Sequence, residues 1–203
     1  ISFLPRAVMQ GIPLLYGSTG EILTEKSGNL NLGIPGIMYV GGICGVIGAF
    51  FYEQSTPAAS MNGLLAVGIP MLCSLLGSLL MGLLYCLLTV TLRANQNVTG
   101  LTITTFGLGL YFFIGKGLGD RWPVMTSADA LVSGLSAREI PLLSSIPVVG
   151  KALFSHNILV YLGILVAAAV WWYLTCTKTG LRLRSVGENP GAADSVGVNI
   201  LLY

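Results

Sequence analysis

The sequence predicts an all-α fold, a polytopic transmembrane helical bundle with about five spans. Hydrophobic residues make up 54% of its 203 positions and charged residues only 9%, with a mean hydropathy of +0.81. A soluble domain carries about 25% charged residues, so this chain lacks the polar side chains to cover a water-exposed surface. Its 27 glycines indicate the same environment, because small residues let helices pack closely in lipid. The net charge of +2 gives no reason to expect a nucleic-acid partner.

Five apolar runs approach the roughly 20 residues that an α-helix needs to cross a bilayer. They lie at about 7–24, 30–52, 64–89, 98–118 and 157–176. The first run contains three glycines and Pro13, so we expect either a broken or irregular helix there, or a helix packed against protein and not lipid.

Small residues recur at helical spacing in the next two runs. Gly41 and Gly45 form a small-xxx-small pair in the second run, and Gly77 and Gly82 lie in the third. We interpret these four positions as faces on which neighbouring helices approach closely. Around the start of the second run we expect irregular, protein-shielded backbone over 28–36, because Pro35 and three glycines disfavour a continuous helix.

The fourth run places Thr102, Thr105, Phe106 and Gly109 on one helical face. One interpretation is plain packing, with the threonine hydroxyls bonded to carbonyls of their own helix. The other is a polar path through the membrane, which Asn31 would also face if the segment before the second run opens onto it. The residues themselves leave both interpretations open.

Two segments outside the apolar runs carry most of the remaining polar residues. Residues 119–156 combine prolines, serines and both signs of charge, which indicates an ordered extramembrane loop with interfacial helices. In 177–200, Asn189 is a good N-cap, Pro190 suits the first helical position and Gly197 suits a C-terminal stop.

These signals predict a short extramembrane helix over 190–196. Ala192, Ala193 and Val196 would share one face, with Asp194 and Ser195 toward the other. Such a face is too small to anchor in lipid and suits a groove of a neighbouring protein. An ordinary connecting loop is the alternative.

We expect no catalytic residue, metal site or cofactor, because no nucleophile–base pair, HExxH, GxSxG or paired-cysteine arrangement occurs. The nearest approach to a P-loop fails on spacing. Five residues, not four, separate Gly109 from Gly115, and Gly117 stands where Ser or Thr would bind magnesium.

The stretch GLRLRSVGENPGAADSVGVNI (180–200) resembles the cytoplasmic coupling loop of ABC-importer permeases, whose signature is Glu-Ala-Ala, three residues, then Gly. Gly191, Ala192, Ala193 and Gly197 fall on those positions, with Gly191 in place of the glutamate. The branch serving simple sugars and nucleosides, which is related to the branched-chain amino acid permeases, is similar in three further stretches. They are GEILTEKSGNLNLGIPG (20–36), LRANQNVTGL (92–101) and IPLLSSIPVVGKALF (140–154).

This resemblance implies a multi-pass permease subunit in the bacterial plasma membrane, without enzymatic activity of its own. Its expected partners are ABC ATPase subunits, a second permease subunit of a different paralogue, and an extracellular substrate-binding lipoprotein. Residues 119–156 would be extracellular and 177–200 a cytoplasmic coupling loop. Family members are about a hundred residues longer, so we expect 1–203 to be one permease domain truncated at its C-terminus. The implied ATPase-coupling residues are Arg182, Arg184, Glu188, Asn189, Gly191, Ala192, Ala193, Asp194 and Gly197.

By the same resemblance, nucleosides are the first expected substrate and simple sugars the second. A different class remains as the alternative, an ion-coupled secondary carrier or channel for a small polar solute. Such proteins usually carry charges inside the membrane. Glu21, Glu25 and Lys26, at the edge of the first run, are the candidates here.

Overall fold

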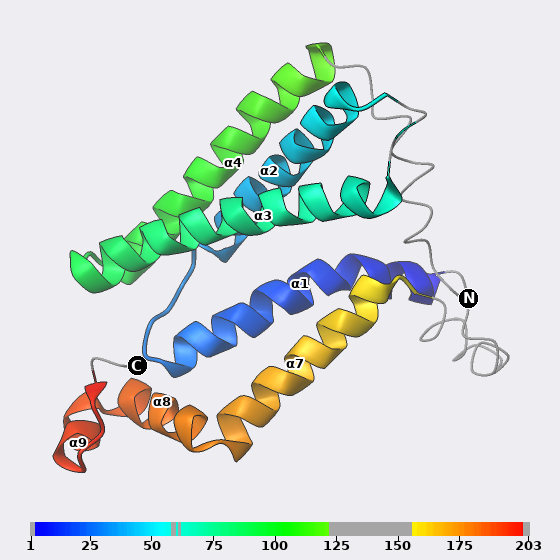
Figure 1. Cartoon of the computed structure of the whole chain (residues 1–203). Coiled ribbons are helices and arrows are strands. Elements are labelled where there is room, and N and C mark those ends of the chain that lie inside the picture. Colours follow the sequence, from blue (N-terminus) through cyan, green and yellow to red (C-terminus); the bar gives the residue numbers. More distant parts are fainter. Residues whose placement is uncertain (1–2, 58–59, 61, 122–155, 201–203) are drawn as a thin grey trace, which may run out of the picture. The chain divides into compact units, whose positions relative to one another are not determined.

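A computed structural model of the chain describes residues 3–57, 60, 62–121 and 156–200. The regular elements of this described part are helices, which confirms the predicted all-α class (Figure 1). In chain order they are α1 (Phe3–Lys26), α2 (Ile34–Ser55), α3 (Gly63–Cys86), the π-helical turn η2 (Leu87–Thr91), α4 (Gln96–Arg121), α7 (Ile158–Cys176), α8 (Lys178–Glu188) and α9 (Pro190–Ser195). Apart from its ends, the loop expected at 119–156 lies outside the described residues.

In the described part of the chain, four helical segments are long and apolar enough to cross a membrane. They are Ile34–Ser55, Gly63–Thr91, Gln96–Lys116 and Ile158–Cys176. Their outer surfaces carry large apolar side chains, since Leu80, Phe113 and Leu165 are 67%, 80% and 63% exposed. Exposed side chains of this kind are stable against lipid and unfavourable against water. The prediction of a polytopic helical bundle is therefore confirmed.

The broken first helix that the sequence suggested is wrong. α1 is one continuous helix of 24 residues with Pro13 inside it, and it is not among the four spans. A proline removes a single backbone hydrogen bond, and the positive-φ glycines of the described chain are Gly28 and Gly197, both outside α1. Packing on α7 supports the helix, because the hydroxyl of Tyr16 donates to the carbonyl of Leu159 at 2.9 Å.

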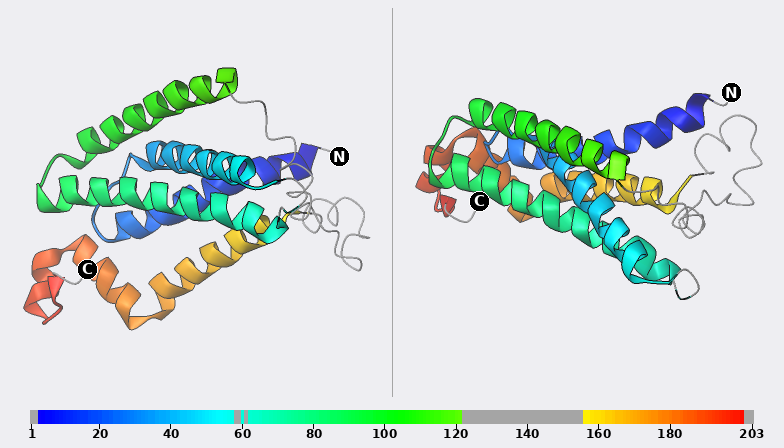
Figure 2. Two further views of the ribbon diagram at one scale, coloured as in Figure 1. Left: turned by 45° about the horizontal axis from the view of Figure 1, so that its top comes forward. Right: turned by 90° about the horizontal axis from the view of Figure 1, so that it is seen from above.

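The chain forms two compact units, of which one comprises Ile1–Asn31 with Ser136–Tyr203 and the other Leu32–Leu135. In the first unit α1 packs on α7 and α8, and α8 packs on α9 (Figure 1). In the second unit α2 packs along both α3 and α4 (Figure 2). A small core of Met81, Tyr85 and Ile103 lies there, with Ile37 and Val40 of α2 against it.

Small residues line the contact between α2 and α3. A Cβ placed on Gly41 would overlap the hydroxyl of Ser78, and one on Gly45 would lie 3.3 Å from the carbonyl oxygen of Pro70. Gly77 receives the side chain of Cys44 in the same way. Gly82 does not belong to this contact, since a Cβ there would meet nothing within 4 Å. It stands outside the close approach because only one side of α3 faces α2.

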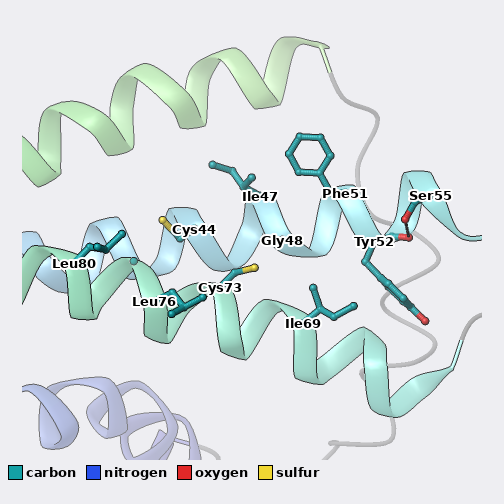
Figure 3. Close-up of a pocket in the computed structure, with 11 residues that line it drawn as sticks. Cys44, Ile47, Gly48, Phe51, Tyr52, Ser55, Ile69, Cys73, Leu76 and Leu80 are labelled. Atoms are coloured by element: carbon teal, nitrogen blue, oxygen red, sulfur yellow. Dashed lines mark hydrogen bonds between the residues drawn. The ribbon is translucent and has the colours of Figure 1, made fainter.

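A groove of about 540 Å³ opens between α2 and α3 beyond this contact (Figure 3). Its lining is almost wholly apolar, with Ile47, Phe51, Ile69, Leu76 and Leu80 among the side chains. The groove lies within two of the spans and offers few hydrogen-bond partners, so it does not suit a polar solute.

Candidate coupling site

The segment 177–200, here called the coupling segment, begins with a sharp change of direction at Thr177. The hydroxyl of Thr177 donates to the carbonyl of Tyr173 at 2.6 Å, and its oxygen accepts from the backbone N–H of Gly180 at 3.0 Å. One side chain thus closes the last turn of α7 and caps α8. Gly180 packs directly on the backbone of Tyr173, where a Cβ would overlap the carbonyl oxygen. This fixes α8 to the end of the α7 span (Figure 1).

The helix predicted over 190–196 is confirmed as α9 (Pro190–Ser195), and both of its ends have the expected chemistry. The Oδ1 of Asn189 accepts from the backbone N–H of Ala192 at 3.0 Å. Gly197 has a φ of +81°, and the N–H of Val198 donates to the carbonyl of Ala193 at 3.0 Å. That bond is the outer bond of a Schellman motif, the usual C-terminal stop at a glycine.

The predicted grouping of side chains on α9 needs a correction. Ala193 is only 2% exposed within the isolated chain, whereas Ala192 is exposed and Val196 is 77% exposed. A helix of six residues is stable only if one side packs on a neighbour, and α9 packs on α8. Ala193 is therefore not available on the exposed side of α9. The exposed residues of α9 and its C-cap, here called the exposed face of α9, are Pro190, Gly191, Ala192, Asp194, Ser195 and Val196.

The charged residues of the coupling segment are distributed over both helices. Arg182, Glu188 and Asp194 are exposed. Arg184 is half-buried, and its Nε atom is buried without a hydrogen-bond partner in the described chain. The surface that follows the α7 span is therefore water-compatible and of mixed charge.

The backbone between α1 and α2, residues 27–33, forms a second structured element, here called the linker. α1 ends in another Schellman motif, with Gly28 at a φ of +92° and the N–H of Asn29 bonded to the carbonyl of Thr24 at 3.1 Å. The carboxylate of Glu21 accepts from the N–H of Asn31 at 2.8 Å, and Asn31 is 6% exposed. Asn31 is thus buried and bonded to the end of α1.

The irregular backbone expected over 28–36 extends only to Gly33. Ile34, Pro35 and Gly36 already belong to the first turn of α2. The reason is that a proline in the first turn of a helix loses no hydrogen bond, because those N–H groups have no partner within the helix.

The threonine-bearing face of α4 is exposed within its unit. The hydroxyls of Thr102 and Thr105 donate to the carbonyls of Val98 and Leu101 at 2.8 and 2.9 Å. Phe106 is 52% exposed beside them. Each hydroxyl oxygen keeps acceptor capacity after back-bonding, so the structure keeps these three residues together and leaves both interpretations open.

Sequence reasoning missed the residues that hold the coupling segment in place. Thr177, Gly180 and Gly187 were not singled out, nor was Gly28 as a helix stop. A local signal existed for one of them, since Gly28 follows Lys26 in the last turn of α1 as a C-terminal stop does. For Gly187 the contacting backbone is remote in sequence, and no local pattern marks it.

Comparison with known proteins identifies the class. The family model described as branched-chain amino acid transport system, permease component, matches residues 4–203, and the chain belongs to this family. Four apolar spans lie among its described residues, and it is a multi-pass membrane protein of the bacterial plasma membrane.

Curated relatives cover nearly the whole chain. It is 32% identical to the guanosine ABC transporter permease protein NupQ of Bacillus subtilis, over 97% of this chain and 59% of that protein. It is 34% identical to the nucleoside ABC transporter permease protein NupC of Lactococcus lactis, over 94% and 57%. It is 29% identical to the putative glucose ABC transporter permease protein TsgC13 of Haloferax volcanii, over 98% and 56%. The chain thus spans less than three fifths of each relative, and no solved structure matches it.

Proposed function

We propose that this chain forms the translocation path of an ABC importer for nucleosides, with simple sugars as the second substrate class, and that its coupling segment docks on a separate ATPase. The observation that carries the proposal is α9, a helix capped at both ends, which α8 joins to the α7 membrane span. The names of the nucleoside-transporting relatives support the substrate class.

The exposed face of α9 has the chemistry of a docking surface. Gly191 and Ala192 permit close approach of a partner backbone, and Val196 offers apolar area to a groove. Because Thr177 joins α8 to α7 by two hydrogen bonds, a push on α9 would reach the span as a rigid-body displacement. ATP hydrolysis would take place in the ATPase, so 177–200 would lie in the cytoplasm and 119–156 would lie outside the cell.

The threonine-bearing face of α4 is the proposed substrate path. A phenyl ring such as that of Phe106 can stack on a nucleobase, and the oxygens of Thr102 and Thr105 can accept from ribose hydroxyls. The apolar groove between α2 and α3 offers no comparable polar partners. The expected extracellular lipoprotein and a second, paralogous permease would complete the importer.

An ion-coupled carrier is less well supported. Glu21 is the most deeply placed of its candidate charges, and its carboxylate already accepts from the backbone of Asn31. A group with that structural role is a poor ion-coupling site, because releasing it would break the hydrogen bond that it accepts from the backbone of a buried residue.

The test uses the full-length protein, co-expressed with an ABC ATPase of the same organism, and measures ATPase co-purification and ATP-driven guanosine uptake into proteoliposomes. Ala192→Phe should weaken ATPase binding about tenfold, because overpacking a fitted site costs about 1–3 kcal/mol. Ala168→Phe is the matched control, since Ala168 is exposed on the α7 span. If Ala192→Phe leaves both readouts intact, 177–200 is only a connecting loop. Uptake driven by an ion gradient without ATP would support the carrier.

A further inference from the structure

Gly28 and Gly187 bring two backbones into direct contact. A Cβ on Gly187 would overlap the carbonyl oxygen of Lys26 and lie 2.9 Å from the N of Gly28. A Cβ on Gly28 would lie 3.3 Å from the Cα of Gly187. All of these neighbours are backbone atoms, which cannot rotate aside as a side chain can. A side chain at 187 would therefore force the two backbones apart, whereas at 28 glycine is favoured by the positive φ and by the tight 3.3 Å contact.

This contact, here called the glycine contact, joins the coupling segment to the linker. Gly187 lies in the last turn of α8, just before the Asn189 cap of α9. Gly28 opens the linker and is the left-handed residue that ends α1. The linker is held to α1 by the hydrogen bond from Asn31 to Glu21. Movement of the C-terminal end of α8 would therefore act on a linker that is already hydrogen-bonded to α1.

The far end of the linker is bonded to α4 within the second unit. The hydroxyl of Thr104 donates to the carbonyl of Leu32 at 2.8 Å, and a Cβ on Gly100 would lie 2.9 Å from the N of Leu32. Thr104 belongs to the same helix as Thr102 and Thr105. The linker thus has one end against the coupling segment and the other against the helix that carries the proposed substrate path.

We propose that Gly28 and Gly187 are positioning residues of the importer, through which displacement of α8 and α9 reaches the linker and then α4. The inference rests on the proposed function. Its physical basis is that close-packed backbone atoms resist compression, so a small displacement at one side of the glycine contact must move the other.

The experiment compares Gly187→Ala with Gly28→Asn in the full-length importer. Alanine at 187 collides with backbone, whereas asparagine at 28 tolerates the left-handed conformation and adds only a tight 3.3 Å contact. Gly20→Ala on α1 is the matched control, because its Cβ would meet nothing within 4 Å. The readouts are ATPase co-purification and guanosine molecules transported per ATP hydrolysed in proteoliposomes.

We expect Gly187→Ala to keep the ATPase bound while transport per ATP falls at least about fivefold, the lower end of typical coupling between sites. Gly28→Asn should show a smaller fall and Gly20→Ala none. A purely structural role would reduce the amount of complex and leave this ratio unchanged.

Each other outcome has a definite meaning. A wild-type protein that binds no ATPase contradicts the proposed function. If the wild-type protein acts as an importer but Gly187→Ala leaves the guanosine transported per ATP unchanged, the proposed role of the glycine contact is wrong and the proposed function stands. If the Gly187→Ala protein does not insert into the membrane, the guanosine transported per ATP by Gly28→Asn tests the proposal instead. Loss of folded protein in both variants makes the contact structural and also overturns the proposal.

Discussion

The carboxylate of Glu21, near the end of α1, accepts a 2.8 Å hydrogen bond from the backbone N–H of Asn31, ten residues further along the chain. The bond closes a loop over the linker and places Asn31 in a buried position. A carboxylate that satisfies a buried N–H in this way stabilises the local backbone by more than a neutral acceptor does. The backbone of the linker is therefore held in one conformation by this bond.

Replacing Glu21 with Ala should loosen the linker. A hydrogen bond to a charged group contributes about 1.5–3 kcal/mol, so the amide of Asn31 should exchange its hydrogen about tenfold faster or more. Glu21→Gln keeps an acceptor oxygen and should retain part of the protection. Glu25→Ala is the control, because Glu25 is exposed in the same helix. Equal exchange in all three variants would show that the bond does not order the linker.

The contact between α2 and α4 should depend on Gly107 far more than on Gly109. A Cβ on Gly107 would overlap the backbone of Gly36, whereas one on Gly109 would meet nothing within 4 Å. Gly107→Ala must therefore separate the two helices and should lower the thermal stability of the purified protein by several degrees. Gly109→Ala should leave the melting temperature unchanged or raise it slightly, since alanine favours helix. The reverse order would contradict this packing.

The parts of the fold that sequence predicts here are those set by adjacent residues. Asn189, Pro190 and Gly197 identified α9 because helix ends are decided by caps within a few positions. The four spans followed from length and hydropathy alone. Both signals are local, so no knowledge of packing was needed.

The failures depend on contacts between separate helices, most of them remote in the chain. The direction of Ala193 follows from the packing of α9 on α8, which its own residues do not specify. The continuity of α1 across Pro13 is supported by the bond from Tyr16 to Leu159 in α7. The partner of Gly187 lies at the other end of the chain. The glycines around Gly41 were recognised by spacing, but spacing could not exclude Gly82.

The cap of α9 gives a prediction about local stability. Asn189→Ala removes the acceptor for the N–H of Ala192 and should destabilise α9 by about 1 kcal/mol. Amide hydrogens of Ala192 and Ala193 should then exchange several times faster. Asn189→Asp retains the acceptor and should preserve the protection. If the alanine variant exchanges like the wild type, the cap contributes nothing and α9 is held by α8 alone.

The exposed threonines of α4 give the sharpest test of the substrate path. Thr105→Val keeps the shape of the side chain and removes only the hydroxyl, whose oxygen is free to accept from a solute after donating to Leu101. Loss of one neutral hydrogen bond of about 0.5–1.5 kcal/mol should raise the KM for guanosine roughly twofold to tenfold, with ATPase co-purification unchanged. Thr175→Val is the matched control, since Thr175 is also exposed and bonds to the carbonyl of Trp171 in its own helix. An equal effect of the two substitutions would assign the α4 threonines to ordinary helix packing, because a back-bonded hydroxyl facing lipid should matter alike in either span.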